Sequence, residues 1–176
     1  MESNIIYVPI VLAVLGLLFM FIKMAWVKKQ PAGNDKMQSI SKSIKEGALA
    51  FLAAEYRLLL VFVVIASVLL YVISNVVATT SWLIVPAFII GAFFSALAGN
   101  IGMRIATDAN ARTAEAAKTS LPNALKVSFG GGTVMGLGVA GLAVLGLSLI
   151  FLFLMGSFLT EGGNFYNEMT IVLETL

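Results

Sequence analysis

The sequence predicts an all-α fold, a polytopic transmembrane helix bundle with four complete spans and the start of a fifth. Hydrophobic residues make up 60% of the 176 residues and charged residues only 11%, whereas a soluble domain is about half apolar and about a quarter charged. The apolar residues gather in four runs, and each is long enough to cross a bilayer, which takes about 20 helical residues. We expect spans over residues 5–27, 48–77, 82–103 and 127–159, and the beginning of another from residue 169.

The first run does not resemble a secretory signal peptide, because the residues before it, Met1 to Asn4, carry no basic side chain and the run is too long. At the other end, residues 169–176 begin a new apolar helix that is only about two turns long. We therefore expect residues 1–176 to form the N-terminal part of a single membrane domain that belongs to a longer protein.

The basic residues predict the orientation. All 11 lie in or beside two loops, the one after the first run and the one after the third. Cytoplasmic loops carry an excess of lysine and arginine, so both loops are expected in the cytoplasm and the N-terminus outside the cell membrane. The basic residues are Lys23, Lys28, Lys29, Lys36, Lys42, Lys45, Arg57, Arg104, Arg112, Lys118 and Lys126.

In the first basic loop, Pro31 and Gly33 indicate a turn. A helix is expected to restart near Ser39 or Ser43, because Ser43 to Glu46 fits a capping box. This helix would enter the membrane from the cytoplasmic interface through residues 46–57.

The third helix is expected to continue beyond the membrane to about residue 120. Arg104, Asp108 and Arg112 are spaced four apart, so they share one face and can form ion pairs along a hydrated helix. An alternative role for Arg104 or Arg112 is contact with an anionic ligand. Ser120, before Pro122, is a candidate N-cap for the fourth helix.

Two rows of small residues predict close helix packing. One consists of Gly91, Ser95 and Gly99, and the other of Gly132, Gly136 and Ala140. Small side chains allow helix backbones to approach each other in membranes. The two rows could pack on each other or on helices outside this chain.

The sequence offers no residues for catalytic, cofactor-binding or metal sites. Cysteine and histidine are absent, and the central parts of the four runs hold no ionisable side chain, although pumps usually carry such residues inside the membrane. The net charge of +2 gives no reason to expect a nucleic-acid partner. Taken alone, the four helices are typical of a scaffold.

Three segments nevertheless resemble one family. Residues 44–57 (IKEGALAFLAAEYR), 99–113 (GNIGMRIATDANART) and 129–138 (FGGGTVMGLG) are similar, in order and spacing, to the second, third and fourth helices of membrane-bound, ion-translocating pyrophosphatases. Each segment alone is only a helix rich in glycine and alanine. Together they extend over residues 44–138, more than half of the chain, and make the resemblance specific.

The resemblance implies a homodimeric pump in the lipid bilayer that hydrolyses pyrophosphate with Mg²⁺, and with K⁺ in some members, and moves H⁺ or Na⁺ out of the cytoplasm. The aspartate-rich substrate motifs of the family lie on later helices, so the Mg²⁺ sites are expected outside this chain. The four helices would then be outer-shell helices, inactive on their own. The alternative is a self-contained four-helix membrane protein with a structural or partner-binding role.

Overall fold

The computed structural model describes residues 7–77 and 82–159, with side chains placed up to residue 154. This part of the chain forms four helices and no strand: α1 (Tyr7–Lys28), α2 (Asp35–Val76), α3 (Ile84–Ala117) and α4 (Leu121–Leu159). Each helix contains a segment apolar and long enough to cross a membrane. The predicted all-α membrane bundle is therefore confirmed, while the expected fifth span from residue 169 lies outside the described residues.

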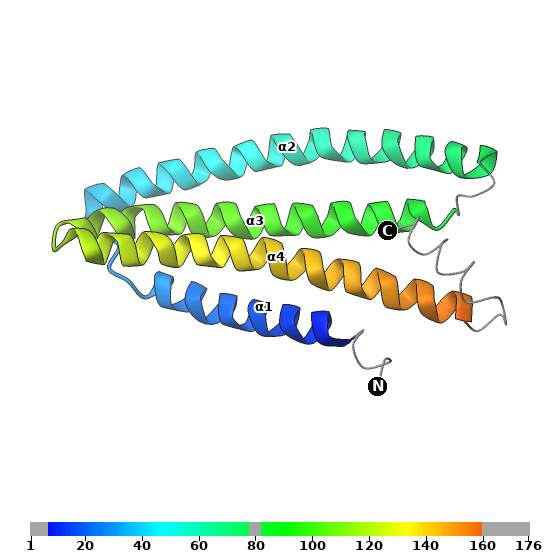
Figure 1. The fold of residues 1–176 in the computed structure, drawn as a ribbon. Helices are drawn as coiled ribbons and strands as arrows, with labels where there is room; N and C mark the ends of the chain where they lie inside the picture. Colours follow the sequence, from blue (N-terminus) through cyan, green and yellow to red (C-terminus); the bar gives the residue numbers. More distant parts are fainter. Residues whose placement is uncertain (1–6, 78–81, 160–176) are drawn as a thin grey trace.

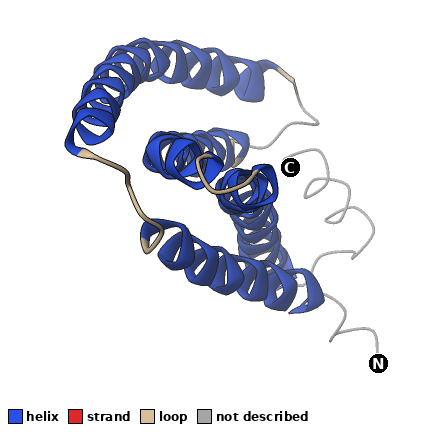
Figure 2. Ribbon diagram, turned by 90° about the vertical axis from the view of Figure 1, so that its left-hand side faces the viewer, coloured by secondary structure: helices blue, strands red, loops and turns tan. Residues whose placement is uncertain are grey.

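The helices lie side by side with α3 and α4 in the middle (Figure 1). Helix α1 packs mainly on α4, and α2 packs on α3. The loop after α1 therefore passes along one side of the α3–α4 pair to reach α2, as Figure 2 shows. Consecutive helices α1 and α2 end up on opposite sides of the bundle.

Helix α2 begins earlier than the sequence suggested. The expected start near Ser39 or Ser43 is wrong, because the N-cap is Asn34, whose side chain accepts a hydrogen bond from the backbone N–H of Met37 at 3.0 Å. The Ser43 hydroxyl instead donates to the carbonyl of Ser39, one turn earlier in the same helix. An earlier cap had already satisfied the free donors, so Ser43 has no helix end to cap.

Gly33 makes the sharp entry to this helix possible. Its φ of 85° lies in the left-handed region that favours glycine. Its carbonyl accepts a hydrogen bond from the Gln38 side chain at 2.9 Å. Helix α2 then runs for 42 residues, about 60 Å, so it extends well beyond the hydrocarbon core.

The cytoplasmic extension of α3 is confirmed, because the helix continues from the apolar run to Ala117. A short turn leads to α4, where the predicted cap is also confirmed: the Ser120 hydroxyl accepts from the N–H of Asn123 at 3.3 Å. The fourth helix thus starts at Leu121, before the apolar run begins at Val127.

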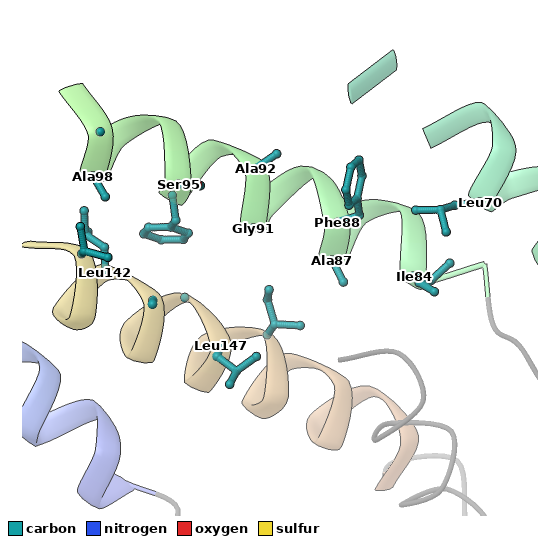
Figure 3. A pocket seen from close by; sticks show the side chains of 16 residues that line it. Leu70, Ile84, Ala87, Phe88, Gly91, Ala92, Ser95, Ala98, Leu142 and Leu147 are labelled. Atoms are coloured by element: carbon teal, nitrogen blue, oxygen red, sulfur yellow. The ribbon is translucent and has the colours of Figure 1, made fainter. Parts of the chain in front are cut away.

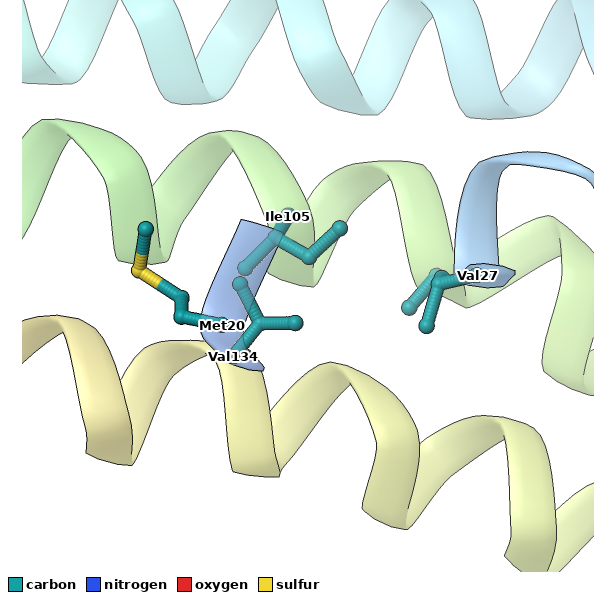
Figure 4. Packing of buried hydrophobic residues seen from close by; sticks show 5 residues of the cluster. Met20, Val27, Ile105 and Val134 are labelled. Carbon is teal, nitrogen blue, oxygen red and sulfur yellow. The ribbon is translucent and has the colours of Figure 1, made fainter. Parts of the chain in front are cut away.

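The tightest packing lies where α1, α3 and α4 meet. Met20 and Val27 of α1, Ile105 and Ala109 of α3 and Val134 of α4 form one buried cluster (Figure 4). Helix α2 adds only Leu52 to the buried residues of the described chain. The bundle is therefore a compact group of three helices with α2 attached on one side.

Glycines of α4 allow this compact group to form, but they are not the ones that the sequence suggested. A side chain at Gly131 would meet Ala109 of α3, and one at Gly130 would meet Trp26 of α1. In contrast, an added Cβ at Gly132 or Gly136 would meet nothing within 4 Å. Both predicted rows lie on exposed surface, so the option that they pack on each other is wrong.

Candidate functional site

The strongest interaction between charged side chains of different helices lies near the two basic loops. Lys45 of α2 forms an ion pair with Asp108 of α3, with Nζ and Oδ1 2.7 Å apart. The Asp108 side chain is only 18% exposed and that of Lys45 40%. The expected ion pairs between Asp108 and the arginines on its own helix do not form, because Lys45 pairs with the carboxylate while Arg104 and Arg112 bond to other groups.

Arg112, one turn further along α3, connects α3 to α1. One terminal nitrogen donates to the carbonyl of Asp108 at 2.5 Å, and the other donates to the carbonyl of Lys28 at 3.2 Å. The second bond satisfies a free carbonyl at the C-terminus of α1, where a positive charge also interacts favourably with the helix dipole. Arg112 is therefore placed as a structural clamp, and this clamp had no signal in the sequence beyond its spacing from Asp108.

Other polar side chains at this end form bonds within single helices. Arg104 is exposed and donates from Nε to the Asn100 side chain at 2.7 Å. Lys118 and Glu115 form the expected pair across one turn, 2.5 Å apart. Contact of Arg104 or Arg112 with an anionic ligand stays a prediction.

A groove runs along the membrane-embedded halves of α3 and α4 (Figure 3). It has a volume of about 830 Å³ and is lined mainly by small and apolar side chains, among them Ala87, Gly91, Ser95 and Ala98 of α3 and Leu142 of α4. Leu70 of α2 lies at its edge. The predicted row Gly91, Ser95 and Gly99 thus faces an open groove rather than a helix of this chain.

The acidic side chains of the described chain do not gather in one place. No three of them, alone or with other ligand types, come together there. Asp108, Glu115 and Glu46 each lie next to a lysine of their own.

Comparison with known proteins places the chain in a family. Residues 14–174 match the family of inorganic H⁺ pyrophosphatases. A protein of Clostridium tetani whose name contains the words "K(+)-stimulated pyrophosphate-energized sodium pump" is 44% identical over 137 residues, which are 78% of this chain and 19% of that protein.

Two further relatives differ in the ion that their names give. The K⁺-insensitive pyrophosphate-energized proton pump of Pyrobaculum aerophilum is 41% identical over 132 residues, 74% of this chain and 18% of the pump. The K⁺-stimulated pyrophosphate-energized sodium pump of Thermotoga maritima is 42% identical over 117 residues, 65% of this chain and 15% of the pump.

The chain spans about a fifth of the length of the curated relatives that it matches. The match nevertheless covers nearly all of its own length, and the four membrane-length helices agree with a multi-pass membrane protein. By sequence and by architecture, this chain belongs to the family of membrane-bound inorganic H⁺ pyrophosphatases.

Proposed function

We propose that this chain supplies four outer helices of a membrane pyrophosphatase that couples pyrophosphate hydrolysis to the transport of H⁺ or Na⁺ out of the cytoplasm. The match of residues 14–174 to the pyrophosphatase family carries the proposal. The dispersed carboxylates support the scaffold role, because a site for several Mg²⁺ ions needs acidic residues close together. Mg²⁺, which would neutralise the phosphates and activate water, and K⁺ where it is required, would bind to other parts of the pump.

The groove between α3 and α4 supports a role within a larger assembly. Its floor is lined by small residues such as Gly91 and Ser95, which leave room for a further helix to approach closely. The relatives are about four times as long as this chain, so their remaining helices could supply such a partner. The homodimer expected for the family would place a second copy of the whole assembly beside the first.

A split-pump experiment tests this function. The Thermotoga maritima pump would be shortened by the region that this chain matches and expressed with and without this chain in the same membranes. We expect magnesium-dependent phosphate release from pyrophosphate only when both parts are present. The variant Ser95→Leu, which fills the groove, should lower that release, whereas Ile65→Leu on the exposed side of α2 should not.

Phosphate release by this chain alone, above membranes without it, would contradict the scaffold role. Failure of the pair to recover any activity, with both parts shown to be present in the membrane, would contradict the proposed place of the chain in the pump.

We also propose that the N-terminus lies outside and that the two basic loops lie in the cytoplasm. The support is that both loops at one end of the bundle are basic, whereas the N-terminal residues, the turn between α2 and α3 and residues 160–168 contain no lysine or arginine. Because the chain has no cysteine, single cysteines can report the side directly. In intact cells, Asn34→Cys and Thr119→Cys should be protected from an impermeant thiol reagent, and Val77→Cys should be labelled. The reverse pattern would overturn the orientation.

A further inference from the structure

Two lysines approach one indole ring on the face that α1 and α4 share. The ammonium group of Lys23 in α1 lies 5.7 Å from the ring centre of Trp26, and that of Lys126 in α4 lies 5.8 Å from it. Lys23 also lies 5.4 Å from the ring centre of Phe19, one turn earlier. The three side chains Lys23, Trp26 and Lys126 are called the basic-aromatic cluster below.

The structure holds this cluster in place through the helix pair itself. A side chain at Gly130 of α4 would lie 2.9 Å from the Trp26 ring, so the glycine leaves the space that the indole occupies. Gln30 donates from its side chain to the carbonyl of Trp26 at 3.1 Å, which fixes the last turn of α1. Trp26 is half-buried, so one part of the ring packs on α4 and another part stays accessible.

Neither lysine has an acidic partner in the described part of the chain, where the ion pairs within 4.0 Å use other lysines. The lack of a partner matters most for Lys23, which follows a long apolar run near the end of a membrane span. A charged group at such a depth is costly unless it reaches the interface or finds a counter-charge. Tryptophan is enriched at the level of the lipid headgroups, and Lys23 and Trp26 lie in the last two turns of α1, next to the first basic loop.

We propose that the basic-aromatic cluster binds the headgroup of an anionic phospholipid from the leaflet that faces the basic loops. The two ammonium groups would pair with the lipid phosphate, and the indole would pack against the glycerol region. Basic pockets between transmembrane helices recognise anionic headgroups in this way. The exposed Phe19 ring below the cluster offers an apolar surface for the acyl chain. This inference concerns the membrane and is independent of the proposed hydrolysis.

The chain has two tryptophans, Trp26 at the basic end and the exposed Trp82 before α3, and this allows a direct test. The variant Trp82→Phe leaves Trp26 as the only tryptophan, which can be excited selectively at a wavelength that tyrosine does not absorb, and Trp26→Phe leaves Trp82. Each would be placed in phosphatidylcholine nanodiscs that contain a small share of brominated phosphatidylglycerol or, in a parallel sample, brominated phosphatidylcholine. Bromine quenches nearby indole fluorescence, so the ratio of the two signals measures the preference for the anionic lipid.

We expect Trp26 to be quenched preferentially by phosphatidylglycerol and Trp82 to show no preference. Each lysine should contribute about fivefold to the local enrichment, the factor expected for one basic side chain near an anionic surface. In the Trp82→Phe background, the pair Lys23→Gln and Lys126→Gln should remove the preference. Lys23→Arg with Lys126→Arg should retain it, as should the charge-matched control Lys36→Gln with Lys42→Gln.

Free inorganic phosphate or pyrophosphate in excess should leave the quenching of Trp26 unchanged. Loss of quenching on addition of either anion would assign the cluster to a soluble anion and overturn the lipid proposal. Equal quenching of Trp26 by both lipids would also overturn it, as would an equal loss of preference in the glutamine pair and its charge-matched control. A circular dichroism spectrum identical to that of the parent would show that the glutamine pair is folded.

Discussion

Helices α2 and α4 contain equally apolar stretches that are packed very differently. Their most apolar stretches of 18 residues have the same mean hydropathy, 2.6, yet none of the α2 stretch is buried inside the molecule, whereas 28% of the α4 stretch is. Helix α4 lies between α1 and α3, while α2 contacts α3 on one side only (Figure 1). Hydropathy therefore places both helices in the membrane and leaves open which of them packs in the centre of the bundle.

Glycines account for much of the difference. Several α4 glycines, such as Gly131 and Gly138, lie directly against side chains of α3 or α1. The membrane half of α2 carries large side chains instead, and residues such as Val64 and Leu69 remain exposed. Since lipid tails are as apolar as these side chains, only close contact between helices favours packing over lipid. Paired substitutions can test this comparison.

The largest expected difference in the free energy of unfolding is between alanine substitutions of a buried and an exposed isoleucine. Ile105 is 1% exposed at the contact of α1, α3 and α4, and Ile65 on α2 is 56% exposed. Ile105→Ala should lower the free energy of unfolding by about 2–5 kcal/mol, because it leaves a cavity among packed side chains. Ile65→Ala should change it by less than about 0.5 kcal/mol. Unfolding of the purified chain by SDS in mixed micelles measures both, and equal losses would contradict the comparison.

The next largest difference in stability is expected between leucine substitutions of two adjacent glycines of α4. A Cβ on Gly131 would lie 3.0 Å from the Cβ of Ala109, while one on Gly132 would meet nothing within 4 Å. Gly131→Leu should therefore destabilise the bundle by about 1–3 kcal/mol through overpacking. Gly132→Leu should leave the unfolding curve of the isolated chain nearly unchanged. A loss of stability in Gly132→Leu as large as that in Gly131→Leu would show that the described packing of α4 is wrong.

A smaller effect is expected for the ion pair that attaches α2 to α3. Removal of the Asp108 charge by Asp108→Asn should cost about 1 kcal/mol, the upper end for partly exposed pairs. The control is the pair Lys42 and Glu46, 4.0 Å apart and exposed to 78% and 66%, where Glu46→Gln should have no measurable effect. A double-mutant cycle with Lys45→Gln isolates the pair, and a coupling energy near zero would mean that Asp108 does not hold α2 in place.

The smallest effect concerns a hydrogen bond between α2 and α3 inside the membrane half. The Tyr56 hydroxyl donates to the carbonyl of Ala96 at 2.6 Å. Tyr56→Phe should cost about 0.6 kcal/mol, the mean for hydrogen bonds between helices in a membrane protein. Tyr71→Phe, at an exposed position on the same helix, is the control. If the two variants unfold at the same SDS concentration, this bond does not contribute to the attachment of α2.

Several features of the site could be predicted from sequence because they depend on neighbouring residues. The Ser120 cap, the Glu115–Lys118 pair and the extension of α3 beyond the membrane all involve side chains within one turn or one helix. The start of α2 was missed although Asn34 is also a local signal. Asparagine and serine are both good caps, and the capping-box pattern from Ser43 to Glu46 favoured the later start.

The partners of Lys45 and Arg112 could not be predicted in the same way. Lys45 lies 63 residues from Asp108, and Arg112 lies 84 residues from the Lys28 carbonyl that it binds. The basic-aromatic cluster also joins two helices that are distant in sequence. Such contacts depend on the order of the helices in space, and that order is not encoded in the spacing of residues along one helix.

The sequence by itself determined that the chain forms membrane-spanning helices and belongs to the pyrophosphatase family. Both follow from local properties, namely long runs of apolar side chains that lipid must cover and short segments that match a known pattern. Only the tertiary structure decided which small residues are buried. Gly131 and Gly132 are adjacent glycines in one helix, but they point about 100° apart, so the first contacts α3 and the second faces away.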